Sequence, residues 1–146
     1  MREILFRAKR MRDKIWVEGS LLVLDADSGY YFITQPYKSA STLPVKDLIY
    51  NHTHLVNPET VCQYTGMTDK NGVKIFENDI VKMFYKDWGT DIGTIRYMNI
   101  CARFQYCDAS EVSYGVDITC DMEVIGNIFD NPELLKGGVT DVKEPR

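Results

Sequence analysis

Two histidines are the residues of this sequence best suited to metal binding. His52 and His54 are two residues apart, so both would point to one face if they lay on a strand. With a third ligand such as Cys62 or Glu59, such a pair can hold zinc or iron. No motif of fixed ligand spacing accompanies the pair. We therefore predict two surface histidines beside a loop, with no metal site and no cofactor.

Two carboxylates close in sequence are the residues best suited to acid–base chemistry. Glu77 and Asp79 have the spacing to divide the roles of general acid and general base, or to hold Mg²⁺. No histidine, lysine or nucleophile is tied to them by a motif, and the sequence contains no G-x-S-x-G, P-loop or H-E-x-x-H pattern. We predict that both residues shape a turn or the start of a strand. No catalytic residue is assigned, and although catalysis stays open, the sequence favours a protein that is not an enzyme.

The strongest turn signal lies in a polar stretch that is also a candidate recognition loop. Asp69 and Asn71 have side chains that hydrogen-bond nearby backbone, and Gly72 follows them, so turn formation alone accounts for these residue types. Loops held by a rigid scaffold are also where recognition residues are often found. Both interpretations stay open. The candidate interaction residues are Gln63, Tyr64, Thr65, Asp69, Lys70 and Asn71.

Basic and acidic residues are separated along the chain. The first 14 residues hold six basic and two acidic side chains, whereas residues 104–135 hold seven acidic side chains and no lysine or arginine. Solvated strand faces account for such asymmetry as well as a binding surface does. We hypothesise that the basic arm meets the acidic stretch, within one subunit or between copies, because opposite fields orient association. The residues of this candidate basic arm are Arg2, Arg7, Lys9, Arg10 and Arg12.

A basic arm beside exposed aromatic rings would also suit single-stranded nucleic acid. Such partners are held by aromatic faces next to positive charges, and the chain has nine Tyr, six Phe and two Trp. The spacing of most of these rings fits core and sheet packing instead. The chain carries a net charge of −4, and an acidic body repels phosphate backbones. Nucleic acid is therefore the second choice of partner, after a protein partner or a second copy of the chain.

Length and composition indicate one soluble globular unit. The 146 residues match a common domain size, and 45% hydrophobic with 26% charged residues is ordinary globular usage. The longest aliphatic run, residues 21–24, is far shorter than the ~20 residues that span a bilayer. Arg7 interrupts the apolar stretch near the N-terminus, which argues against a signal peptide. We expect a cytoplasmic protein with no membrane partner. Its cysteines are expected to be reduced thiols: Cys62, Cys101, Cys107 and Cys120.

Short runs of β-branched and aromatic residues between turn residues predict a chain that is mainly strand. No apolar period of three to four residues extends over a window long enough for a substantial helix. Residues 35–44, with two prolines, are the best candidate for a loop, and residues 48–56 are ambiguous. The predicted strands are 14–17, 21–24, 30–34, 61–64, 73–76, 80–85, 93–97, 102–106, 112–119 and 122–129.

Three short patterns predict particular backbone features. Gly19 is expected to supply the positive φ of a tight hairpin between the first two strands. Asn71 and Gly72 predict a type I′ turn, with positive φ at both positions. Asn131 is a good N-cap for a short helix over residues 131–136.

Two longer segments resemble a known protein family. Residues 57–82 read N-P-E-T-V-C-Q-Y-T-G-M-T-D-K-N-G-V-K-I-F-E-N-D-I-V-K, and residues 123–135 read E-V-I-G-N-I-F-D-N-P-E-L-L. With R-E-I-L-F-R at residues 2–7 and W-V-E-G at residues 16–19, the chain is similar to the YopX family, small proteins of bacteriophages and prophages whose function is unknown. The resemblance implies a mainly β fold with an SH3-type barrel in its second half. It supplies no catalytic residue to transfer.

Two positions depart from the pattern of that family. Cys62 and Asn78 stand where the family usually has glycine. Asparagine is the best substitute for glycine at a positive φ, so we expect Asn78 in the left-handed conformation. Cysteine is not, so position 62 is expected to have ordinary strand dihedral angles.

The predicted organisation is a single structural unit with three parts. A short N-terminal β-hairpin region with a loop covers residues 1–56, a small SH3-type β-barrel with a helical turn covers residues 57–138, and residues 139–146 form a flexible tail. We predict a non-catalytic phage or prophage accessory protein that acts as a protein-interaction or assembly module through its loops or a strand edge. The alternative is a nucleic-acid-binding module that uses the basic arm and exposed aromatics.

Overall fold

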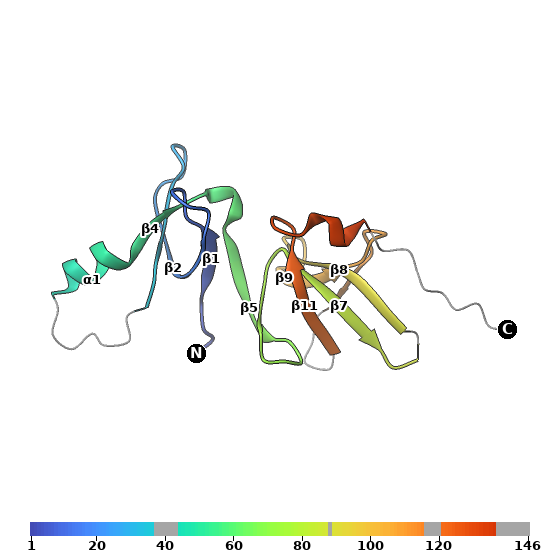
Figure 1. Ribbon diagram of the computed structural model, residues 1–146. Coiled ribbons are helices and arrows are strands. Elements are labelled where there is room, and N and C mark those ends of the chain that lie inside the picture. The colour runs from blue at the N-terminus through green and yellow to red at the C-terminus, as the bar shows by residue number, and fades with distance from the viewer. Residues whose placement is uncertain (37–43, 88, 116–120, 137–146) are drawn as a thin grey trace. The chain divides into compact units, whose positions relative to one another are not determined.

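The computed structural model describes residues 1–36, 44–87, 89–115 and 121–136 of the chain (Figure 1). They form two compact units, Met1–Gly66 and Met67–Arg146. Both units consist mainly of antiparallel strands, so the prediction of a mainly β fold is confirmed. The sequence-based division at residues 56 and 57 stays a prediction, and the predicted tail lies outside the described residues. No helix in the described part of the chain is long and apolar enough to cross a membrane.

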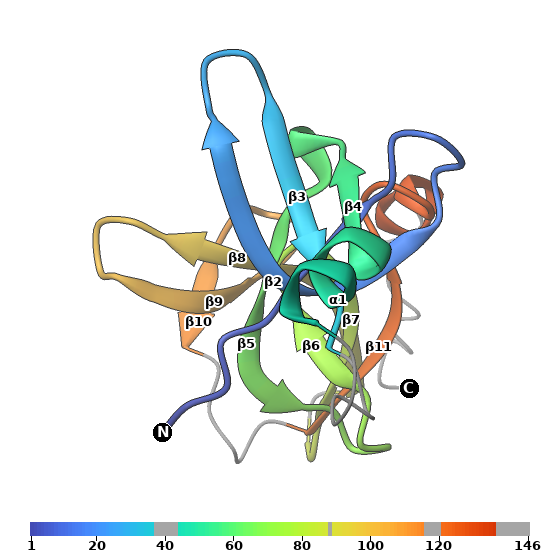
Figure 2. The same cartoon turned by 90° about the vertical axis from the view of Figure 1, so that its left-hand side faces the viewer.

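The first unit is built on one antiparallel sheet with the strand order β4-β3-β2-β1-β5. Strand β5 runs past Gly66 into the second unit, where its next neighbour in the sheet is β6. Figure 2 shows β2 and β3 as a long hairpin whose turn extends beyond the end of β4. The elements are β1 (Phe6–Lys9), β2 (Trp16–Asp25), β3 (Tyr30–Thr34), α1 (Val45–His52), β4 (Thr53–Val56), η1 (Pro58–Thr60), β5 (Cys62–Thr68) and β6 (Lys74–Phe76).

Strand β2 is continuous through Gly19, so the predicted hairpin at that position is wrong. The strand pairs with β1 up to Gly19, which lies opposite Phe6, and with β3 from Ser20, which lies opposite Thr34. A Cβ atom on Gly19 would collide with the backbone carbonyl of Thr34. Glycine is therefore required here for close approach of two backbones rather than for a positive φ.

Alternating apolar residues of four strands form the core of this unit. Ala8, Val17, Ile33 and Val56 come from β1, β2, β3 and β4 respectively, and all four are buried. Helix α1 was missed by the sequence analysis because its eight residues are too few to show a helical period. His52 ends this helix, so the two histidines do not lie on one strand as the metal hypothesis assumed.

The residues that follow β1 run along the outer edge of β4. Met11 N donates to Leu55 O at 2.9 Å, and Asn57 N donates to Lys9 O at 2.8 Å. Between these bonds, Arg10 and Val56 form an isolated antiparallel bridge. The pairing brings the turn at residues 10–14 beside β4, although the two segments are far apart in sequence.

The second unit holds an antiparallel sheet with the strand order β10-β9-β8-β7-β11. Its buried core is Ile75, Val81, Met83, Ile95, Tyr106 and Met122. Among the described residues this sheet has two ends, β10 and β11, so the closed SH3-type barrel stays a prediction. The elements are β7 (Asp79–Tyr85), β8 (Gly89–Met98), β9 (Arg103–Cys107), β10 (Ser113–Gly115), β11 (Asp121–Asn127) and η2 (Pro132–Leu135).

The turn between β5 and β6 differs from the predicted type I′ turn. Gly72 has a φ of 80°, but Asn71 has no positive φ. Gly72 N donates to Asp69 O at 3.0 Å, and Asp69 N donates to Val73 O at 2.8 Å. These bonds define a turn with a single left-handed glycine at its end. The Asp69 carboxylate favours this form because its Oδ1 accepts from the amides of Asn71 and Val73, at 2.8 and 2.9 Å.

Of three further backbone predictions, two are confirmed and one is wrong. Asn78 has a φ of 66°, which confirms the left-handed conformation, and Cys62 begins β5 without a positive φ, as expected. The predicted C-terminal helix is instead the short 3₁₀ element η2. Asn131 makes no side-chain cap there, because its Oδ1 accepts from Asn127 N at 3.3 Å instead.

Candidate functional site

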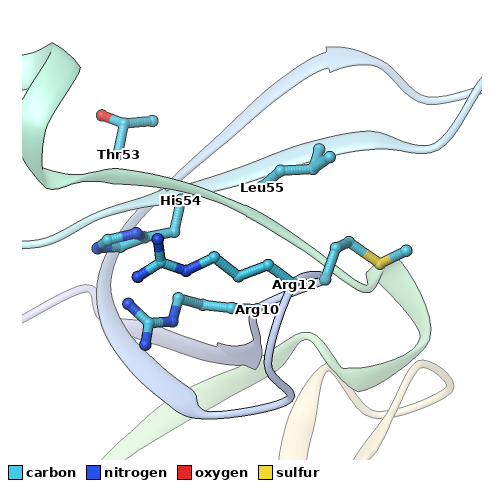
Figure 3. Close-up of a pocket in the computed structure, with 6 residues that line it drawn as sticks. Arg10, Arg12, Thr53, His54 and Leu55 are labelled. Carbon is cyan, nitrogen blue, oxygen red and sulfur yellow. The ribbon is translucent and has the colours of Figure 1, made fainter.

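The turn after β1 and the outer edge of β4 enclose a cavity of about 230 Å³ in the first unit. Figure 3 shows that the guanidinium groups of Arg10 and Arg12 and the imidazole of His54 gather on one side of it. The residues that line the cavity are Arg10, Met11, Arg12, Thr53, His54 and Leu55.

Asp13 holds the two arginines of this cavity in place. Its carboxylate accepts from Arg10 Nε at 3.0 Å and from Arg10 Nη2 at 2.6 Å, a bidentate pair. Arg12 Nε lies 3.5 Å from the same carboxylate. Desolvation alone would raise the pKa of Asp13, but hydrogen bonds from Arg10 and from the Ile15 amide outweigh it and lower this pKa. Asp13 therefore stays ionised near neutral pH and orients both guanidinium groups.

His54 is held from the opposite side by Gln35. The distance from His54 Nε2 to Gln35 Oε1 is 2.8 Å, which fixes the ring and occupies one of its two nitrogens. Burial lowers the pKa of His54, and the positive charges of Arg10 and Arg12 lower it further. The ring is consequently neutral near pH 7. Because Gln35 Oε1 accepts from Nε2, the other nitrogen of the neutral ring is an acceptor, so the donors available to an anion here are the two guanidinium groups.

The polar side chains of this lining are two guanidinium groups, the imidazole of His54 and the hydroxyl of Thr53. Among the described residues, no group of three His, Cys, Asp or Glu side chains is placed to hold a metal ion.

The outer face of strands β2, β3 and β4 carries a row of apolar side chains. Leu22 lies opposite Phe32, and Phe32 lies opposite Leu55, so the three side chains share one face of the sheet. Leu22 is 43% exposed and Leu55 39% exposed, while Phe32 is half-buried. Leu24, two residues further along β2 at a shift in the register with β3, is 67% exposed. An apolar row of this kind on a solvent-facing sheet is unusual unless something covers it.

The predicted interaction residues are divided between the two units. Gln63, Tyr64 and Thr65 lie on β5 in the first unit, where Tyr64 is buried. Asp69, Lys70 and Asn71 lie in the turn of the second unit. Their role in recognition stays a prediction.

Asp69 and Lys70 have clear structural roles in that turn. The buried Asp69 carboxylate accepts the two turn amides and also the Val124 amide, at 3.0 Å. The Lys70 Nζ atom lies 3.7 Å from the centre of the Phe84 ring and 3.4 Å from Glu123 Oε2. The turn is thus fixed to β7 and β11 within the second unit.

The predicted basic arm is part of the folded first unit. Arg7 and Lys9 lie on β1, where the Arg7 guanidinium is 4.9 Å and the Lys9 Nζ 5.4 Å from the centre of the Trp16 ring. Only Arg10 and Arg12 of the five predicted residues line the cavity. The sequence analysis did not connect them with His54, because the pairing of residues 9–11 with β4 has no local signal.

Comparison with known proteins identifies a family and structures that are similar to this chain. The model of the YopX protein family matches residues 5–136. The crystal structure of protein EF1440 from Enterococcus faecalis is similar, with a TM-score of 0.53 and 25% sequence identity, and the match covers 92% of this chain and 99% of that chain. No curated protein sequence matches the chain.

Proposed function

The chain belongs to the YopX family, and we propose that it is a non-catalytic protein-interaction or assembly module of a bacteriophage or prophage, acting in the bacterial cytoplasm. The single observation that carries this proposal is the exposed apolar row on the outer face of β2, β3 and β4. Burial of exposed apolar surface is the main source of affinity in most protein associations.

A sheet face supports the proposal better than the outer edges of β4 and β11 do. The outer edge of β4 is already hydrogen-bonded to residues 9–11. The outer edge of β11 is partly occupied, because Lys70 N donates to Met122 O at 3.0 Å and the Val124 amide donates to Asp69. Strand addition requires free backbone groups, so the outer edges of β4 and β11 are poor sites for it. We place the contact on the face that contains Leu22, Phe32 and Leu55.

Nucleic acid is the second candidate partner, and the exposed guanidinium of Arg12 is the observation that favours it. The Arg12 side chain is 74% exposed. The Trp16 ring is already in contact with Arg7 and Lys9. Single strands are held by aromatic faces next to positive charge. The cavity region supplies the positive charge, which is one of these two requirements.

The proposal is tested by affinity capture from prophage-induced cells, with the full chain as bait. The bait variant is the double substitution Leu22→Thr and Leu24→Thr, which removes apolar surface while threonine preserves strand propensity. The matched control is Ile100→Thr, which changes an exposed apolar residue in the second unit. We expect proteins captured by the parent chain to be lost with the double variant and retained with the control. Equal capture by all three baits, each shown to be folded by circular dichroism, would refute a contact at this face.

A further inference from the structure

The cavity between the turn after β1 and strand β4 carries positive charge that plays no part in the contact proposed for the apolar row. We propose that Arg10 and Arg12, beside His54, form an oxyanion site that receives side-chain carboxylates of an acidic protein segment. The inference rests on the proposed function in that it names the chemistry of the protein partner. Leu55 borders both the cavity and the apolar row, but the two arginines are not part of that row, so either contact can fail without the other.

The two guanidinium groups and the neighbouring imidazole are positioned before any ligand arrives. Asp13 fixes Arg10 through two hydrogen bonds and holds Arg12 Nε at 3.5 Å. Gln35 fixes the ring of His54 through Nε2 at 2.8 Å. Side chains that are already ordered lose less conformational entropy when they bind a ligand, so such a site binds more tightly than one whose side chains are mobile beforehand.

Several donors of the two arginines remain available in the described part of the chain. The Asp13 carboxylate accepts hydrogen bonds from Nε and Nη2 of Arg10 and forms an ion pair with Nε of Arg12. The remaining donors, Nη1 of Arg10 and both terminal nitrogens of Arg12, can bind a ligand. Guanidinium groups match carboxylate geometry, and the bidentate contact between Arg10 and Asp13 shows that this cluster already binds one carboxylate.

The lining favours a protein carboxylate over a nucleic-acid phosphate. It contains two apolar residues, Met11 and Leu55, and no Phe, Tyr or Trp ring on which a base would stack. The volume of about 230 Å³ is below the range of drug-sized ligand pockets, and it suits the end of one or two side chains. The net charge of −4 also opposes a long polyanion more strongly than it opposes a short acidic segment.

Two sources of such a segment are open, and the sequence itself contains one of them. Residues 104–135 hold seven acidic side chains and no lysine or arginine. Asp121, Asp130 and Glu133 of that stretch are exposed. The same segment of a second copy of the chain therefore has the required chemistry, as does an acidic segment of another protein.

The two histidines make this site directly observable by proton NMR of the full chain. The imidazole C2 proton of His54 reports on the cavity, and that of His52, at the end of α1, is the internal control; a His52→Gln variant assigns the two signals. The probes are a short oligoglutamate peptide and a single-stranded oligothymidylate of equal length. We expect oligoglutamate to shift the His54 signal with saturation, to leave His52 unchanged, and to bind more weakly at high salt.

Arg12→Ala and Lys46→Ala are matched substitutions, since each removes one exposed positive charge from the first unit. Arg12→Ala should weaken oligoglutamate binding about fivefold, the effect of losing one exposed ion pair. Lys46→Ala should leave it nearly unchanged. The inference is overturned if oligoglutamate does not move the His54 signal, if Lys46→Ala weakens binding as much as Arg12→Ala, or if oligothymidylate binds more tightly than oligoglutamate.

Light scattering of the same proteins identifies the source of the acidic segment. Concentration-dependent self-association that Arg12→Glu abolishes and Lys46→Glu preserves would assign the site to a second copy of the chain. A monomer that still binds oligoglutamate at His54 would assign it to another protein. Both results support the carboxylate site.

Discussion

Asp69 offers the sharpest test of how the second unit is held together. Its Oδ1 atom accepts from two turn amides, those of Asn71 and Val73, while Oδ2 accepts from the amide of Val124 on β11. Oδ1 therefore stabilises the turn, and Oδ2 links the turn to the sheet. Asp69→Asn disrupts the second interaction, and Asp69→Ala removes both.

The expected loss of stability follows from that division. Asp69→Asn retains one acceptor oxygen for the turn but places an NH₂ group against the Val124 amide, and an unsatisfied half-buried donor costs about 1–3 kcal/mol. Asp69→Ala also removes the turn bonds, which resemble a side-chain cap worth about 1 kcal/mol. We expect losses in the free energy of unfolding of about 1–3 kcal/mol for Asp69→Asn and about 2–4 kcal/mol for Asp69→Ala.

Urea unfolding and amide hydrogen exchange measure these effects together. Exchange at the Val124 amide should accelerate in both variants, and Asp121→Asn, which changes an exposed carboxylate of the same strand, should alter neither measurement. Equal stability of Asp69→Ala and the parent chain, or unchanged exchange at Val124, would refute the assignment of Asp69 as the link between turn and sheet.

The same residue makes stability depend on pH in a defined direction. Burial alone would raise the pKa of Asp69, but the bonds from the three amides and the charge of Lys70 outweigh it, so the folded-state pKa lies below the ordinary 3.8. Its contribution is therefore fully present above about pH 4 and is lost as the pH falls through the lowered folded-state value. Asp69→Ala should flatten this part of the stability profile, and an unflattened profile would show that other carboxyls cause it.

Three further predictions concern glycines and thiols. Gly19→Ala should destabilise the first unit by about 1–3 kcal/mol, because the new Cβ would meet the backbone carbonyl of Thr34 rather than a movable side chain; an unchanged melting temperature would contradict this close approach. Gly72→Val should cost about 1–2 kcal/mol from backbone strain alone, since the space around Gly72 is open, and Gly72→Asn should cost less in the same thermal melt. A thiol reagent should modify the exposed Cys101 in the native protein and the buried Cys62 only after unfolding, with four thiols reacting in denaturant without reductant; two or fewer would indicate a disulfide.

Local backbone chemistry explains which parts of the fold were predictable from the sequence. The left-handed Asn78 was predictable because asparagine tolerates this conformation, and the mainly β fold followed from short apolar runs between turn residues. The family was recognisable because residues 57–82 form one uninterrupted pattern, and membership is confirmed over residues 5–136.

Non-local contacts explain what the sequence could not provide. Gly19 has the signature of a turn, and only the passage of β3 beside it shows that it serves close packing. Asn71 precedes a glycine as in a type I′ turn, but the Asp69 side chain selects a different turn. Arg10 and Arg12 were among the predicted basic residues, whereas His54 joins them only because residues 9–11 pair with β4.

The central claim, that the sheet face of the first unit binds a protein, is tested most directly by hydrogen exchange on the chain alone and in complex with a captured partner. The account predicts that the partner slows amide exchange in β2, β3 and β4, around Leu22 and Leu55, and that a nuclease leaves this protection intact. Protection confined to residues 2–14 and abolished by nuclease would contradict the account and assign the chain to nucleic acid.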